Sequence, residues 1–389
     1  MINQKSAVRR HKSVFALVTV TAIFSLSIFA QEPPTITVSK GDRINLTVSP
    51  LTGGEGAAAT KTLQNDLTLS GYFILSGNAA YTARGSATGG SLQGQVVDHS
   101  GGTVLSKSYN GSARENAHHF ANDIIETLTG NKGFATSKIA FIATRSGKKE
   151  VYVADYDGSN TRQMTHDGVI SVHPSISPDG RHIAYTGYQS GYPDVYLIDL
   201  GSGARNKIVN FPGTNSGASF SPDGNRIALS VSKDGNPELY TVNASGGGAR
   251  RLTRTRGVES SPSWSPTGDE IVYSFDEGSG PQLYRISAGG GIGQPISTGH
   301  GYCTEPSWSP DGKKITFNVR GGGGFEIAIV DLGGGTRTVC AGENPVWGAD
   351  SRHLIFTEGD ALYMIDTINA HRSKILDGLG KISEPSWSR

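Results

Sequence analysis

A six-residue phrase recurs along the second half of the chain at a fixed interval of 44 residues. The clear copies are SISPDG, SFSPDG, SWSPTG and SWSPDG, which begin at Ser175, Ser219, Ser263 and Ser307. Two degenerate copies follow, VWGADS from Val346 and SWSR from Ser386. Self-similarity at a period of roughly 40–45 residues indicates a repeat architecture, and this period is typical of the blades of a β-propeller.

Short apolar runs follow each copy and predict strands. After the first copy come HIAYTG from His182 and DVYLID from Asp194, and the later copies are followed by equivalent runs. Runs of Ile, Val, Tyr and Phe between turn residues are typical of strands. Ser-Pro-Asp-Gly favours a tight turn, because Pro presets φ and Gly tolerates positive φ. Each repeat is therefore predicted to be a four-stranded antiparallel blade.

The count of strands predicts how the ring closes. KIAFIA from Lys138, EVYVAD from Glu150 and RQMT from Arg162 match the second, third and fourth strands of a blade that has no first strand before them. The last residues, Glu384 to Ser388, match a first strand with nothing after it. Pairing these segments would complete six blades and remove an exposed sheet edge. We therefore expect an all-β six-bladed propeller over residues 138–389, closed by the C-terminal strand.

Residues 31–135 lack the repeat and predict a small α+β domain. Residues 57–70, AAATKTLQNDLTLS, are expected to form a modest helix. A stronger helix is predicted from Ser112, where Ser112 and Glu115 match a capping box and Gly130 ends the apolar periodicity. One or two strands are expected in ITVSKGDRINLTV, from Ile36, and further strands near Tyr72, Gln93 and Gly102.

The first thirty residues combine a basic start with an apolar run. Four Lys and Arg side chains precede the segment Val14 to Ala30, a pattern typical of a secretory signal peptide. We expect cleavage after Ala30, and an uncleaved anchor is the alternative. Without this segment 31 Lys and Arg face 34 Asp and Glu, so the charge balance gives no reason to expect nucleic acid as a partner. Cys303 and Cys340 are too few for a disulfide framework.

The residues just before each first strand are expected to line one rim of the central opening. Four of the eight are carboxylates and none is basic. They are His173, Asn215, Glu259, Thr304, Glu305, Glu343, Asn344 and Glu384. Such an acidic rim could hold a cation, could receive a basic loop of another protein, or could consist of solvated linker residues.

The remaining motifs indicate little chemistry. DYDGSN, from Asp155 to Asn160, lacks the full order of a calcium loop and is interpreted as a turn. His118 and His119 are adjacent on the predicted helix, so their side chains point about 100° apart, and a partly solvated face is expected rather than joint metal ligation. The sequence contains no Gly-x-Ser-x-Gly, His-Glu-x-x-His or Walker motif. We therefore expect neither catalytic residues nor a cofactor.

Two other functional classes stay open. Propeller enzymes, lyases or hydrolases, carry a metal or histidine in the central funnel, and here only His173 is placed there. A sugar-binding module would need exposed aromatic side chains in the funnel. The four tryptophans are expected inside first strands, where packing is their more ordinary role, so this class ranks last.

Several stretches resemble the TolB family of the Tol-Pal envelope system. They are ITVSKGDRINLTVSP, VVDHSGGTVLSKSY, the junction LTGNKGFATSKIAFIATRSGKKEVYVADYDG, FPGTNSGASFSPDG and TEPSWSPDG. The resemblance covers nearly the whole chain after the leader. It implies a monomeric, non-enzymatic periplasmic adaptor without a cofactor, which supports outer-membrane integrity and cell division.

The resemblance also implies two partners. In the family the lipoprotein Pal docks on the face of the acidic rim, and Thr304 to Pro306 match the family motif there, so the eight rim residues become the expected Pal-binding set. A second segment matches the strand whose neighbourhood engages TolA by adding a strand to that protein's sheet. It consists of Thr35, Ile36, Thr37 and Val38.

Overall fold

The computed structural model describes residues 43–389. These residues belong to one compact unit, Ser39–Arg389. The expected signal peptide and the expected TolA-binding segment, Thr35 to Val38, lie outside the described residues. Within the described range, no helix combines the length and the apolar character needed to cross a membrane.

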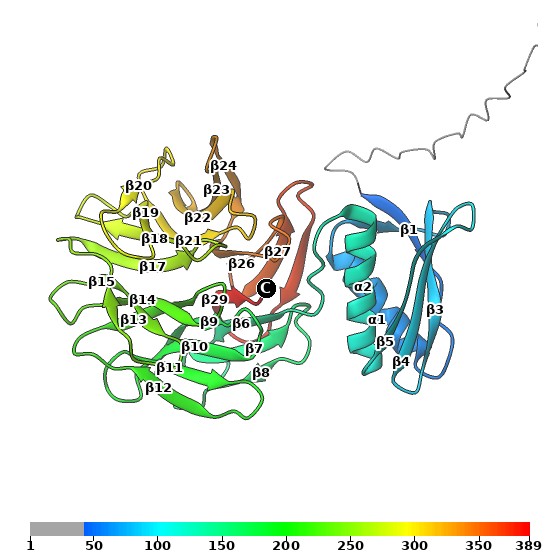
Figure 1. The fold of residues 1–389 in the computed structure, drawn as a ribbon, viewed down its shortest axis with the longest axis horizontal. Coiled ribbons are helices and arrows are strands. Elements are labelled where there is room, and N and C mark those ends of the chain that lie inside the picture. Colours follow the sequence, from blue (N-terminus) through cyan, green and yellow to red (C-terminus); the bar gives the residue numbers. More distant parts are fainter. Residues whose placement is uncertain (1–42) are drawn as a thin grey trace, which may run out of the picture. The chain divides into compact units, whose positions relative to one another are not determined.

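An α/β domain comes first (Figure 1). Its five-stranded sheet has the order β2-β1-β3-β4-β5, and the two helices pack against one of its faces. The elements are β1 (Ile44–Val48), α1 (Gly56–Leu69), β2 (Phe73–Leu75), β3 (Tyr81–Thr88), β4 (Ser91–Asp98), β5 (Thr103–Asn110) and α2 (Ala113–Thr129).

The helix signals in the sequence are confirmed. The Ser112 side chain accepts from the backbone N–H of Glu115, and the Glu115 side chain accepts from the backbone N–H of Ser112, which completes the capping box. The helix ends at Gly130 in the left-handed conformation, with φ of 71°. Strand β3 was not predicted. Its sequence, YTARGSAT, is small and polar, and Gly85 is needed because a Cβ there would clash with the carbonyl oxygen of Gln93.

Six four-stranded antiparallel sheets follow and form the ring of blades (Figure 1). Blades 1 to 3 contain β29 (Ile382–Trp387), β6 (Lys138–Ala143), β7 (Glu150–Asp155) and β8 (Arg162–Gln163); β9 (Ser171–Ile176), β10 (His182–Gly187), β11 (Asp194–Asp199) and β12 (Arg205–Val209); β13 (Asn215–Phe220), β14 (Arg226–Val231), β15 (Glu238–Asn243) and β16 (Arg250–Arg251). Blades 4 to 6 contain β17 (Val258–Trp264), β18 (Glu270–Asp276), β19 (Gln282–Ser287) and β20 (Gln294–Pro295); β21 (Cys303–Trp308), β22 (Lys314–Gly321), β23 (Gly324–Asp331) and β24 (Thr336–Ala341); β25 (Glu343–Trp347), β26 (His353–Glu358), β27 (Ala361–Asp366) and β28 (Arg372–Leu376).

The predicted closure of the ring is confirmed. Strand β29 pairs antiparallel with β6, from Ile382 opposite Ala143 to Trp387 opposite Ile139. The Oγ of Ser388 also accepts from the backbone N–H of Lys138 at 2.8 Å. The C-terminal strand therefore supplies the first strand of blade 1, as the strand count required.

Three positions of the recurring phrase have defined structural roles. Its first serine braces the neighbouring blade; for example, the Oγ of Ser263 accepts from the N–H of Trp308 at 3.1 Å. The apolar second position packs in the interior, and all four tryptophans are at most 5% exposed. The second serine closes the hairpin, since the Oγ of Ser309 accepts from the N–H of Lys314 at 2.9 Å and donates to Asp311 at 2.6 Å.

Candidate functional site

One residue in each blade adopts the left-handed conformation where the first strand meets the central channel. Each lies at a bulge in the pairing of the first and second strands; in blade 5 the register shifts between Thr304 and Ser307. A bulge re-aims a side chain, and a positive φ at a residue other than Gly is strained, a feature that clusters at functional sites. These residues are His173, Ser261, Glu305, Asn344 and Glu384, with φ between 51° and 56°, and Gly217, with φ of 70°.

The left-handed residues line a cavity of about 210 Å³ along the channel. In five of the six blades a proline follows the left-handed residue and forms buried wall, and in blade 3 the residue is Ala218. The prolines are Pro174, Pro262, Pro306, Pro345 and Pro385. The channel therefore has an apolar wall, and each blade contributes one left-handed residue that lines the cavity.

Four of the eight predicted rim residues line this cavity: His173, Glu305, Asn344 and Glu384. Thr304 and Glu343 stand one position earlier in their strands, half-buried and exposed respectively, and are not among the lining residues. Placing Asn215 and Glu259 at the rim is wrong, because both side chains are fully buried.

The prediction placed the channel-facing residue of blades 3 and 4 at the wrong position along the first strand. Asn215 and Glu259 precede the left-handed position by two residues, and Asn215 instead donates to the carbonyl oxygen of Phe211 at 2.8 Å. The residues missed in blades 3 and 4 are Gly217 and Ser261. The sequence held the signal, since every left-handed residue lies two positions before the first residue of a phrase copy.

The channel side chains are joined from blade to blade by hydrogen bonds. The Nδ2 of Asn344 donates to Glu305, and the Oδ1 of Asn344 accepts from the backbone N–H of Glu384 at 3.2 Å. The Oε2 of Glu384 then accepts from the backbone N–H of His173 at 2.5 Å. The imidazole Nδ1 of His173 lies 3.1 Å from the Oγ of Ser216. These hydrogen bonds thus connect the channel-facing strands of five successive blades.

The charge of the channel is acidic on one side but partly balanced. Burial raises the pKa of Glu305, and the neighbouring carboxylates of Glu384 and Glu343 add to this effect. Glu384 is paired with Lys149, whose Nζ lies 3.2 Å from its Oε1. Arg389 also lines the cavity and donates to the carbonyl oxygen of Trp308 at 3.3 Å. The two basic side chains were missed because the turn after β6 and the end of the chain reach the channel only in the folded ring.

Buried Glu259 is expected to make stability depend on pH. Burial raises its pKa to about 7 from an ordinary value of 4.5, with nearby Glu238 raising it further and Thr255 and Arg251 opposing. The protonated form is thus favoured in the fold, and the free energy of unfolding should fall as pH rises from about 4.5 to 7. We expect Glu259→Gln to stabilise the protein by up to about 3 kcal/mol at pH 8 and to have little effect at pH 4. Urea unfolding at both pH values measures this, and parallel pH profiles for the two proteins would contradict it.

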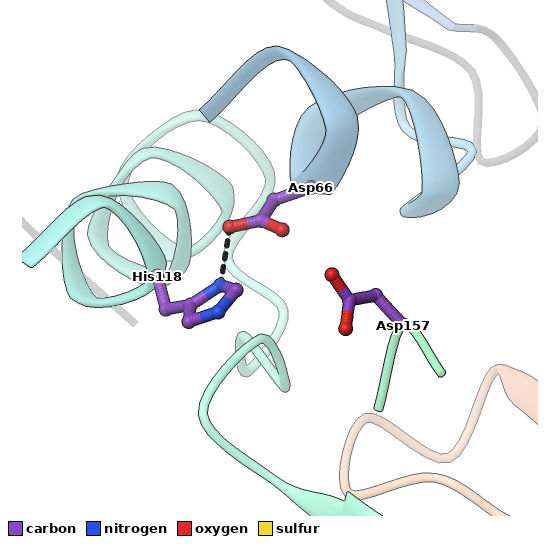
Figure 2. A group of neighbouring side chains, drawn as sticks. All are labelled: Asp66, His118 and Asp157. Atoms are coloured by element: carbon purple, nitrogen blue, oxygen red, sulfur yellow. Dashed lines mark hydrogen bonds and ion pairs between the residues drawn. The ribbon is translucent and has the colours of Figure 1, made fainter. Parts of the chain in front are cut away.

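A cluster of Asp66, His118 and Asp157 brings helices α1 and α2 to the turn after β7 (Figure 2). Its potential metal-ligating atoms lie within 4.8 Å of one another. However, Asp66 is bonded to the imidazole Nδ1 of His118 and to the hydroxyl of Tyr156, both at 2.7 Å. Both oxygens of Asp157 accept from the guanidinium of Arg114 at 2.7 Å. These hydrogen bonds join helices α1 and α2 to the turn after β7, and we call the cluster the clasp.

In this cluster the burial of His118 differs from the expectation, whereas the turn from Asp155 to Asn160 agrees with it. His118 was expected on a partly solvated face, but it is 5% exposed because it packs against Asp66, whereas His119 is exposed. The segment Asp155 to Asn160 forms the turn between β7 and β8, as interpreted from its sequence.

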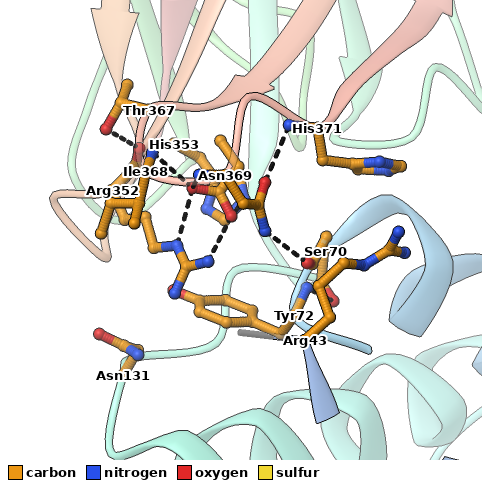
Figure 3. Close-up of polar contacts among 12 residues, drawn as sticks. Arg43, Ser70, Tyr72, Asn131, Arg352, His353, Thr367, Ile368, Asn369 and His371 are labelled. Carbon is orange, nitrogen blue, oxygen red and sulfur yellow. Dashed lines mark hydrogen bonds and ion pairs between the residues drawn. The ribbon is translucent and has the colours of Figure 1, made fainter. Parts of the chain in front are cut away.

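A second polar cluster lies where β2 begins and the hairpins of blade 6 end (Figure 3). The Tyr72 hydroxyl donates to Asp350 at 2.9 Å, and the guanidinium of Arg352 lies 4.3 Å from the centre of the Tyr72 ring. Arg352 also donates to Asp366 at 2.8 and 2.5 Å. Burial alone would raise the pKa of Asp350, but the adjacent His353 lowers it to about 2.

Comparisons with known proteins agree with this architecture. A family model described as the TolB beta propeller domain matches residues 125–389. The structure of TolB from Acinetobacter baumannii superposes with a TM-score of 0.80 at 24% identity, covering 89% of this chain and 97% of that one. At this identity the match shows a common fold.

Curated relatives match over shorter segments. The Protein TolB homolog of Chlorobium chlorochromatii is 42% identical over 106 residues, 26% of this chain and 24% of the relative. The Tol-Pal system protein TolB of Geobacter sulfurreducens is 42% identical over 86 residues, 21% of this chain and 20% of the relative. These alignments span a quarter or less of the relatives' length. Since the family model covers more than half of the sequence, the chain belongs to the TolB β-propeller family.

Proposed function

We propose that the protein is a non-enzymatic adaptor of the Tol-Pal system in the periplasm, which supports outer-membrane integrity and cell division. It binds a Pal-like peptidoglycan-associated lipoprotein through the channel mouth. It binds a TolA-like protein through Thr35 to Val38, a role that rests on the resemblance alone. The names of the curated relatives support membership of the Tol-Pal system.

The observation that carries the proposal is the strained, hydrogen-bonded set of channel side chains. The cavity of about 210 Å³ is smaller than the roughly 300–1,000 Å³ typical of small-molecule sites. A cavity of this size can accommodate a few side chains from the tip of a loop of another protein. Glu384 is paired with the ammonium of Lys149 and Glu305 accepts from the amide of Asn344, so an entering donor or cation meets carboxylates that are already held in place.

The alternative, a propeller enzyme with a metal or histidine in the funnel, depends on His173. Its ring contacts Ser216, but Glu384 bonds to the backbone N–H of His173 rather than to the ring. The orienting carboxylate of a nucleophile–base–acid triad is thus missing from this pair. Bound metal in a stoichiometric amount, together with turnover of periplasmic sugars or peptides, would favour the enzyme.

We expect Glu305→Lys to weaken binding of the lipid-free Pal-like domain by about 10- to 100-fold, because it reverses a charge at the centre of the channel. Glu126→Lys makes the same charge change at an exposed position on helix α2 of the N-terminal domain and should leave the affinity within about twofold. Isothermal titration calorimetry with the mature chain measures both. Equal effects of the two substitutions would place the docking site elsewhere.

A further inference from the structure

We propose that an aromatic surface beside the channel mouth is a second contact for the channel partner, and that it takes an apolar segment flanked by acidic residues. We call this surface the Tyr192 platform and define it by the side chains of Ile170, Tyr188 and Tyr192. The inference rests on the proposed function, since it assigns the same protein partner an additional anchor.

The platform consists of large apolar side chains held open to solvent. Ile170, Tyr188 and Tyr192 are 48%, 36% and 70% exposed. The backbone N–H of Tyr188 donates to the carbonyl oxygen of Ile170 at 3.1 Å, so the loop before β9 and the turn between β10 and β11 are joined. Contiguous exposed apolar side chains mark interaction surfaces, and Tyr is enriched among the residues that dominate binding energy.

Comparison with equivalent turns shows that the fold does not require these tyrosines. The turn in blade 2, YQSGYP from Tyr188, corresponds to SKDGNP from Ser232 in blade 3 and DEGSGP from Asp276 in blade 4. All three turns end in proline, whereas the positions of Tyr188 and Tyr192 hold Ser and Asn, or Asp and Gly, in the other two. The tyrosines are therefore a local addition to a turn that forms without them.

Hydrogen bonds also join the two loops that carry the platform. The guanidinium of Arg205 donates to both oxygens of Asp167 at 2.6 and 2.9 Å, and the Gln189 amide donates to the same carboxylate at 3.0 Å. The Oγ of Ser190 donates to Asp194 at 2.7 Å. These bonds brace the loop before β9 against the tyrosine turn. A surface fixed in advance loses less conformational entropy when a partner binds.

Position and charge indicate which partner the platform fits. Ile170 stands three residues before His173, which lines the channel, so one partner can reach both. The turn between β6 and β7, TRSGKK, contacts the start of β9 through the N–H of Ser171 and the carbonyl oxygen of Lys149 at 2.9 Å. Arg145 and Lys148 on this turn are exposed, and the turn holds no acidic residue. When an apolar side chain of the partner packs on the tyrosines, the partner residues next to it lie near these cations. Charge complementarity therefore favours acidic residues at those flanking positions.

The test uses the mature chain and the lipid-free domain of the Pal-like lipoprotein. The double variant Tyr188→Ser with Tyr192→Asn carries the residues that blade 3 has in its own turn, so it is expected to fold. We expect its affinity to fall by about tenfold or more, the loss typical of a truncated aromatic anchor. Ile292→Ser is the control: it removes an apolar side chain that is 93% exposed on the turn between β19 and β20, at the other end of the blade strands.

The charge component is tested by Lys148→Glu, which should lower the association rate and weaken the dependence of that rate on salt. If the double variant binds as tightly as the wild type while Glu305→Lys does not bind, the platform is not a contact and the proposed function stands. If the wild type fails to bind the lipoprotein domain, the proposed function itself fails. If the wild type forms a dimer that the double variant loses, the platform is a self-contact and the inference is overturned.

Discussion

Deletion of Pro385 to Arg389 is expected to lower the free energy of unfolding by roughly 4 kcal/mol or more. The deletion removes the side chain of Trp387, which is 5% exposed and packs with its ring centre 5.4 Å from that of Phe134. Removal of a buried Trp side chain alone costs about 3–5 kcal/mol. The deletion also breaks the pairing with β6 and leaves an unpaired edge on blade 1.

Denaturant unfolding, followed by tryptophan fluorescence and by circular dichroism, measures this loss. The matched control removes Arg389 alone, whose side chain makes one hydrogen bond, to the carbonyl oxygen of Trp308. We expect that control to stay close to the full chain. An unchanged midpoint for the longer deletion would mean that the ring does not depend on β29.

Asp366→Ala is expected to destabilise the protein by about 3–5 kcal/mol, because it leaves the guanidinium of Arg352 buried without its partner. The Asp366 side chain is fully buried and that of Arg352 is 8% exposed. Asp366 also accepts from the backbone N–H of Ile368 at 2.9 Å, which holds the turn that follows β27.

Glu358→Ala is the control for this substitution, since Glu358 forms an ion pair with Arg372 in the same blade. The side chains of Glu358 and Arg372 are both more than 30% exposed, and such exposed pairs contribute about 1 kcal/mol or less to the free energy of unfolding. Urea unfolding curves for the two variants make the comparison. Similar losses in both would show that burial of the Asp366 pair does not set its contribution.

The blades and their closure were predictable because their signals are local and repeated. Each phrase copy carries its own turn, its own brace and its own buried position, so Trp387 could be assigned by comparison with Trp264 and Trp308. Strand β3 was not predictable in this way. It is held by its neighbours β1 and β4, and its small polar residues carry no strand pattern of their own.

The candidate site was predictable only in part. His173, Glu305, Asn344 and Glu384 were found because they precede strands that the repeat had already located. Asn215 and Glu259 were misplaced because a bulge changes which residues of a strand face the channel. The contribution of Lys149 could not be read from its own surroundings, since its partner Glu384 lies 235 residues away in the sequence.

The bond between Lys138 and Ser388 joins residues that are 250 positions apart. Bringing the ends of so long a segment together costs roughly 5 kcal/mol in chain entropy by the logarithmic dependence on loop length. That cost is recovered only when the last residues of the chain are present and the other blades have formed. Because β29 is synthesised after every other strand of the ring, blade 1 and the channel cannot be completed until the other blades have all been made.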